Sequence, residues 1–73
     1  MAMLQQMKER VKKTNLKEGD IIFFRMHGKK ISHVGIYLKD FKFIHAATTR
    51  GIVVDDLRTP YYQRTYYTAG RAY

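Results

Sequence analysis

Residues 20–47 read DIIFFRMHGKKISHVGIYLKDFKFIHAA, and over this segment the periodicity of the chain is that of strands rather than helices. Its first seven residues load both faces of an extended chain with apolar side chains, which predicts a strand inside a sheet. Residues 32–38 alternate between two faces and residues 43–47 form another short run, so both predict strands. Further elements are expected along the rest of the chain: short strands at residues 51–54 and 66–73, and a loop or a single helical turn at residues 57–64.

The residues before this segment have a helical pattern. Apolar side chains recur there at helical spacing with charged residues between them: Met3, Leu4, Met7 and Val11. We therefore expect a short amphipathic helix over residues 1–13, followed by a sheet portion over residues 16–73. The predicted fold class is α+β, in which the helix precedes a curved antiparallel sheet of about five strands, a half-barrel. A chain of 73 residues allows one small domain.

The composition excludes several classes of protein. The chain has no Cys, which excludes a disulfide scaffold, a thiolate zinc site and a thiol nucleophile within it. Its formal net charge of +8 favours polyanionic partners such as nucleic acid, anionic lipid or an acidic cell-wall polymer, unless the charge serves only as a solvated surface. No apolar run approaches the roughly 20 residues that span a bilayer. We expect any export signal to lie outside this sequence.

Two histidines carry the chemistry that the sequence offers. If residues 39–41 form a three-residue loop, Tyr37 pairs with Phe43, and His33 and His45 become diagonal neighbours on one face. One imidazole can then hydrogen-bond the other and fix its tautomer, as a base and its orienting residue do in a nucleophilic triad. From spacing alone, a structural role for both histidines and a two-histidine metal site stay open as alternatives.

Four other residues bear on whether the two histidines form a site. Asp55 and Asp56 could supply carboxylates, although a strand end is the more common place for such a pair. His27, in a polar loop beside Gly28, is expected to have no role. Phe41 argues mildly against the three-residue loop, because such loops usually place a Gly at their left-handed position.

Three segments resemble the NlpC-type cell-wall cysteine peptidases. Residues 16–24, LKEGDIIFF, resemble the Leu-x-x-Gly-Asp-hydrophobic-x-Phe-Phe segment of that family. Residues 31–37, ISHVGIY, resemble its Ser-His-Val-Gly-Ile-Tyr strand, and residues 42–46, KFIHA, are similar to its Phe-Ile-His-Ala strand. The resemblance extends in order over residues 16–73.

The resemblance implies a papain-like mechanism, in which a Cys at the start of a helix attacks an amide carbonyl. It implies that His33 is the general base and that His45 orients it. It also implies peptidoglycan stem peptides as substrate, an extracellular or cell-envelope location, and no metal or organic cofactor. Ser32 cannot replace the Cys, because it is the neighbour of His33 in the strand and points to the other face.

The family's Asp-Cys-Ser segment lies upstream of the part that this chain resembles. We therefore expect the C-terminal half of the catalytic domain of a peptidoglycan-hydrolysing cysteine endopeptidase, which carries both histidines but is inactive as written. The alternatives are a non-catalytic basic module that binds an anionic cell-wall polymer and a small basic barrel that binds nucleic acid.

The loss of the Cys helix has a consequence for the sheet. Without that helix one face would be uncovered, and this predicts self-association through it. The residues expected on the uncovered face are His33, Gly35, Tyr37, Phe43 and His45.

Overall fold

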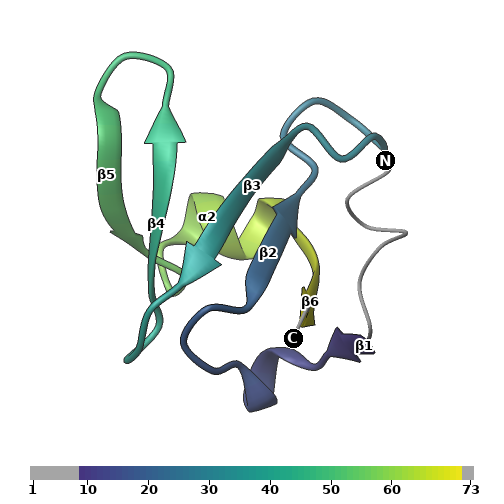
Figure 1. The fold of residues 1–73 in the computed structure, drawn as a ribbon. Helices are drawn as coiled ribbons and strands as arrows, with labels where there is room; N and C mark the ends of the chain where they lie inside the picture. Colours follow the sequence, from purple (N-terminus) through teal and green to yellow (C-terminus); the bar gives the residue numbers. More distant parts are fainter. Residues whose placement is uncertain (1–8, 72–73) are drawn as a thin grey trace.

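The computed structural model describes residues 9–71, and its main feature is an antiparallel sheet of six strands in the spatial order β1-β6-β2-β3-β4-β5 (Figure 1). A 3-10 turn, η1 (Lys13–Asn15), follows the first strand, and a short helix, α2 (Pro60–Thr65), precedes the last one. The strands are β1 (Glu9–Val11), β2 (Ile21–Phe24), β3 (His33–Tyr37), β4 (Lys42–Ala47), β5 (Gly51–Asp56) and β6 (Tyr66–Arg71).

The predicted fold class, an α+β domain with a helix over residues 1–13 and about five strands, is wrong. Residues 1–8 lie outside the described residues. Within the rest of that range, Glu9–Val11 forms β1, which pairs antiparallel with β6 and places Val11 opposite Ala69, and Lys13 begins η1. Val11 is the only apolar residue of the described residues 9–13, so a helix there would have almost no apolar face to bury. A strand instead gains backbone hydrogen bonds to β6 and buries the Val11 side chain.

The central strand is β2, which pairs with β6 on one side and with β3 on the other. Ile22, Phe23 and Phe24 are fully buried, which confirms the internal strand that the apolar run predicts. An ion pair ties the start of this strand to the end of β6. The Arg71 guanidinium donates one hydrogen bond of 2.8 Å to each carboxylate oxygen of the fully buried Asp20. Such a paired charge can stay in the interior because its oxygens are satisfied.

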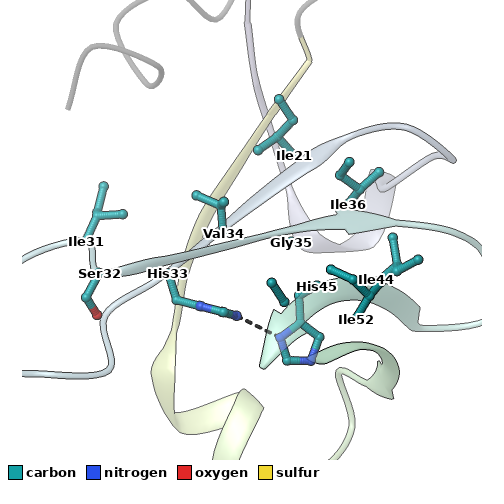
Figure 2. Close-up of a pocket in the computed structure, with 11 residues that line it drawn as sticks. Ile21, Ile31, Ser32, His33, Val34, Gly35, Ile36, Ile44, His45 and Ile52 are labelled. Carbon is teal, nitrogen blue, oxygen red and sulfur yellow. Dashed lines mark hydrogen bonds between the residues drawn. The ribbon is translucent and has the colours of Figure 1, made fainter. Parts of the chain in front are cut away.

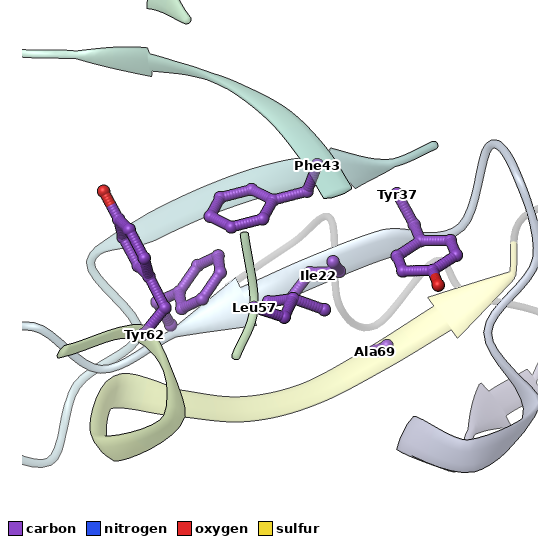
Figure 3. Close-up of a cluster of buried hydrophobic side chains, with 7 residues drawn as sticks. Ile22, Tyr37, Phe43, Leu57, Tyr62 and Ala69 are labelled. Atoms are coloured by element: carbon purple, nitrogen blue, oxygen red, sulfur yellow. The ribbon is translucent and has the colours of Figure 1, made fainter. Parts of the chain in front are cut away.

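The core lies between the sheet and the segment that contains α2 (Figure 3). Pro60 takes the first position of this helix, where its missing N–H costs nothing, and Leu57 and Tyr62 reach from the segment onto the sheet. The buried cluster is made of Ile22, Phe24, Tyr37, Phe43, Leu57, Tyr62 and Ala69.

The face that carries Tyr37 and Phe43 is therefore covered, and the prediction that it would be open is wrong. Phe43 is fully buried and Tyr37 nearly so. The open face is the opposite one, where Ile36 is 47% exposed and Ile52 is 71% exposed. Residues 57–64 are more than a connection, because their apolar side chains Leu57 and Tyr62 pack onto this face of the sheet.

The turn between β3 and β4 has the register that a three-residue loop requires, with Tyr37 opposite Phe43. Asp40 and Phe41 both adopt the left-handed region, with φ of 53° and 67°, without any Gly. Phe41 is held there by its backbone N–H, which donates to the Tyr37 hydroxyl at 2.9 Å. That hydrogen bond offsets the backbone strain of a left-handed Phe41, for which a Gly was expected.

β3 and β4 pair only at Tyr37–Phe43 and Ile36–Ile44, after which β4 and β5 bend away from β3 (Figure 1). Gly35 lies at the point of separation. A Cβ there would come within 2.8 Å of Phe43 Cδ2 and 3.3 Å of the Ile44 carbonyl oxygen. The missing side chain is what lets the Phe43 ring lie against β3.

We predict that Gly35→Ala destabilises the domain by about 1–3 kcal/mol, because the added methyl overpacks the Phe43 ring. Urea unfolding of the wild type, Gly35→Ala, Phe43→Leu and the double variant measures the effect. The smaller Leu side chain should reduce the cost of the added methyl. An equal cost in both backgrounds would show that Phe43 is not the group that the added methyl meets.

Candidate functional site

Two imidazoles bridge the gap that opens between β3 and β4 (Figure 2). His33 begins β3 and His45 lies in β4, and the distance between His33 Nε2 and His45 Nδ1 is 2.7 Å. The rings are nearly perpendicular, at an interplanar angle of 86°. The predicted hydrogen bond between the two histidines is thus present, while their roles as base and orienting residue stay predictions.

The two histidines differ in burial. The side chain of His45 is only 2% exposed, packed over the Phe43 ring and against the edge of Tyr62. His33 is half-buried and lies beside the ring of Phe24. His45 therefore belongs to the core, and His33 is the member of the pair that solvent or a reacting group can reach.

The second nitrogen of His45 is also occupied. His45 Nε2 lies 2.7 Å from Asp55 Oδ2, on the neighbouring strand β5. The same oxygen accepts hydrogen bonds from Tyr62 Oη at 3.0 Å and from the Arg50 guanidinium at 2.5 Å. A continuous hydrogen-bonded chain therefore runs from Asp55 through His45 to His33.

Asp55 was considered in the sequence only as one of a pair of carboxylates at a strand end. The signal that locates it is the register of β4 and β5, in which Phe43 faces Asp55 and His45 faces Val53. Alternate residues share a face, so Asp55 is a diagonal neighbour of His45. Its neighbour Asp56 points the other way, to Lys42 at 3.1 Å and Arg58 at 2.7 Å.

The electrostatics of the site follow from these contacts. Burial lowers the pKa of the His33 imidazole below its ordinary 6.5, and the charge of a protonated His45 lowers it further. The Arg50 guanidinium, with smaller contributions from His45 and Tyr62, holds the pKa of the Asp55 carboxyl at about 2. Burial and the neighbouring Asp55 raise the pKa of the Tyr62 hydroxyl. At neutral pH Asp55 is ionised and His33 is mostly neutral.

An apolar groove of about 620 Å³ opens beside the histidines (Figure 2). We call it the isoleucine groove, and its lining residues are Ile21, Ile31, Ser32, His33, Val34, Gly35, Ile36, Ile44, His45, Ala46 and Ile52. The Ser32 hydroxyl is turned toward Met26, whose backbone N–H it accepts at 3.0 Å. His27 lies in the exposed loop between β2 and β3, apart from the pair.

Over residues 9–71, no three His, Cys, Asp or Glu side chains gather in a way that would hold a metal ion. None of the helices in the described part of the chain is long and apolar enough to cross a membrane.

The chain is similar to known proteins over nearly its whole length. The model of the NlpC/P60 family matches residues 2–71. The chain is 37% identical over 67 residues to a protein of Escherichia coli K12 named murein DD-endopeptidase MepS/murein LD-carboxypeptidase, and the match covers 92% of this chain and 35% of that protein. It thus spans about a third of the length of this curated relative.

Two solved structures have the same fold. An NlpC/P60 family protein from Bacillus cereus matches with a TM-score of 0.77 and 33% identity, over 86% of this chain and 22% of its own. A protein from Staphylococcus aureus, described as similar to lipoprotein of the NLP/P60 family, has a TM-score of 0.76 and 30% identity, over 94% and 23%.

We predict that His33 titrates below pH 6.5 in an NMR titration of the folded chain, because burial disfavours the imidazolium. Below that pH the unfolded chain binds a proton that the folded one does not. The free energy of unfolding should therefore be highest above pH 6.5 and fall as the pH drops toward the pKa of folded His33. The fall should be smaller in His33→Gln. A His33 pKa at or above 6.5 would contradict the burial argument.

Proposed function

Because the chain belongs to the NlpC/P60 family, we propose that it supplies the histidine half of the active site of a peptidoglycan endopeptidase. The nucleophile in this proposal is a Cys outside the sequence, since the chain itself has none. The observation that carries the proposal is the 2.7 Å hydrogen bond between His33 and His45 at the mouth of an apolar groove. A base and its orienting residue need this geometry.

In this proposal His33 is the general base. Its Nε2 is engaged with His45, so Nδ1 is the nitrogen that takes the thiol proton. The thiolate then attacks the amide carbonyl, His33 returns the proton to the leaving amine, and water hydrolyses the thioester. The lowered pKa of His33 keeps its imidazole unprotonated at neutral pH, which is the form that a base requires.

The isoleucine groove takes the helix that carries the Cys. The groove is apolar, it includes His33 at its edge, and Ile36 and Ile52 on that face are exposed in the chain on its own. The E. coli relative has most of its length outside the matched part, which is enough chain to supply such a helix. An apolar helix face laid in this groove would lie against residues that flank both histidines.

The substrate in this proposal is a stem peptide of peptidoglycan, and the site of action is the cell envelope. The E. coli relative is named for endopeptidase activity on murein. The net charge of +8 is suited to a wall rich in anionic groups.

A second candidate is a non-catalytic module that binds an anionic cell-wall polymer. A basic cavity of about 380 Å³ next to the β1–β6 edge favours it, with the Lys13 ammonium 4.8 Å from the centre of the Tyr66 ring. Its lining residues are Arg10, Val11, Lys12, Lys13, Tyr66, Tyr67 and Thr68. The two candidates differ in whether His33 is needed.

We predict that the chain alone does not hydrolyse peptidoglycan and that fusion to the part of the E. coli relative outside the match restores activity, if that part supplies a Cys. Muropeptide release from purified sacculi, followed by chromatography, measures the activity. His33→Ala in the fusion should lower it by a factor of about 100 to 10,000, because proton transfer to a positioned base is lost.

The matched control is His27→Ala, which alters an exposed histidine outside the site and should leave the activity unchanged. Undiminished activity in His33→Ala would remove His33 from the mechanism. A folded fusion that binds sacculi without cutting them would favour the second candidate.

We also predict that the isolated chain self-associates through the isoleucine groove, because Ile52 is 71% exposed there. Size-exclusion chromatography with light scattering should give a mass above 8.7 kDa that falls in Ile52→Lys. Tyr61→Lys, an exposed aromatic on α2, is the control that should keep the larger mass. A monomer at high concentration would count against an apolar contact through this face.

A further inference from the structure

We propose that Asp55 is a positioning residue of this site, which sets the direction of the hydrogen bonds through His45 so that His33 keeps a free Nδ1. This inference rests on the proposed function, because it takes His33 as the base. Asp55 does not touch the reacting atoms and acts only through His45.

The direction follows from which groups can donate. An ionised carboxylate only accepts hydrogen bonds, so the 2.7 Å contact with Asp55 Oδ2 requires the proton of neutral His45 to be on Nε2. His45 Nδ1 is then a lone pair, and the 2.7 Å contact with His33 requires His33 Nε2 to be the donor. A neutral His33 with its proton on Nε2 has its lone pair on Nδ1, as a base needs.

Without Asp55 the two imidazoles would have no preferred direction. The same contact forms equally well if His45 Nδ1 donates to His33 Nε2, and His33 then carries its proton on Nδ1. In that arrangement the nitrogen available to a thiol is already protonated, and neutral His33 cannot act as a base. The charge of the carboxylate is what separates the two arrangements, because hydrogen bonds to an ionised group are roughly twice as strong as neutral ones.

The carboxylate is itself held from three elements of the fold. Arg50 reaches it from the turn between β4 and β5, Tyr62 from α2, and His45 from β4. Arg50 also contacts Oδ1, at 3.4 Å. The side chain of Asp55 is 19% exposed, so these donors replace most of its water. Oδ2 is consequently fixed in the place where it meets His45 Nε2.

The test is the tautomeric state of both histidines, measured on the full chain at neutral pH by long-range ¹H–¹⁵N NMR. In the wild type both imidazoles should carry their proton on Nε2. In Asp55→Leu, which removes the acceptor, the ratio of the two tautomers of His33 should fall by a factor of about 10 to 100. Asp56→Leu changes the adjacent carboxylate, which does not contact either histidine, and should keep the wild-type ratio.

Either of two results would overturn the assignment. One is a proton on Nδ1 of His45 in the wild type, which needs no variant and so holds even if Asp55→Leu fails to fold. The other is a wild-type ratio in a folded Asp55→Leu. Asp55→Asn, whose amide oxygen can still accept from His45, should restore part of the preference for one tautomer.

The measurement also separates this inference from the proposed function, because it needs neither Cys nor substrate. In the active fusion, Asp55→Leu should lower kcat by a factor of about 10 or more with little change in KM, since substrate contacts are intact. If His33→Ala leaves the fusion active, the proposed function fails whatever the tautomers are. If His33 is essential and the tautomers do not depend on Asp55, only the role of Asp55 fails.

Discussion

The hydrogen bond between the two imidazoles spans the place where β3 and β4 stop pairing, and the rest of the structure supports it. Gly35 lets the Phe43 ring lie against β3, and His45 stacks on that ring. Tyr62 comes from α2 to meet both the core and the Asp55 carboxylate. The hydrophobic core and the polar site are therefore built from the same residues, and a change in packing at Phe43 would move His45.

The two faces of the sheet have different tasks. Leu57 and α2 cover the face on which His45 lies, which keeps water from the inner end of the hydrogen-bonded chain. The opposite face keeps exposed isoleucines, and the groove that they line reaches the half-buried His33, whose ring lies on the same side of the sheet as His45. Burial on the covered face shields the hydrogen bonds of His45 from water, and the groove on the open face has room for another segment. The two histidines share one side of the sheet and differ in burial, so the site is enclosed at His45 and accessible at His33.

Periodicity in the sequence was enough to predict the internal strand β2, and it indicated that a three-residue loop between β3 and β4 would bring the two histidines into contact. It did not decide the length of that loop, because Phe41 argued against the three-residue form. It was not enough for elements that depend on tertiary partners. Helical spacing around Val11 was overridden by the free edge of β6, and the covering of the sheet by Leu57 could not be read from a local pattern. The contact of Asp55 with His45 is hard to predict for a related reason, because it depends on the register of a second hairpin, β4–β5. Counting that register across β4 and β5 would have located it.

The three side chains that contact the Asp55 carboxylate, His45, Arg50 and Tyr62, also explain why this ionised group can lie beside an aromatic core. A lone buried carboxylate is costly, and it would attract a proton to the neighbouring imidazole. Arg50 balances its charge at 2.5 Å, so the carboxylate remains a strong acceptor while the Arg50–Asp55 pair has no net charge. With Oδ2 of Asp55 as a fixed acceptor, hydrogen-bond direction can order the protons of the two imidazoles. In the proposed arrangement Arg50 thus acts on the pair of histidines through the aspartate that it holds.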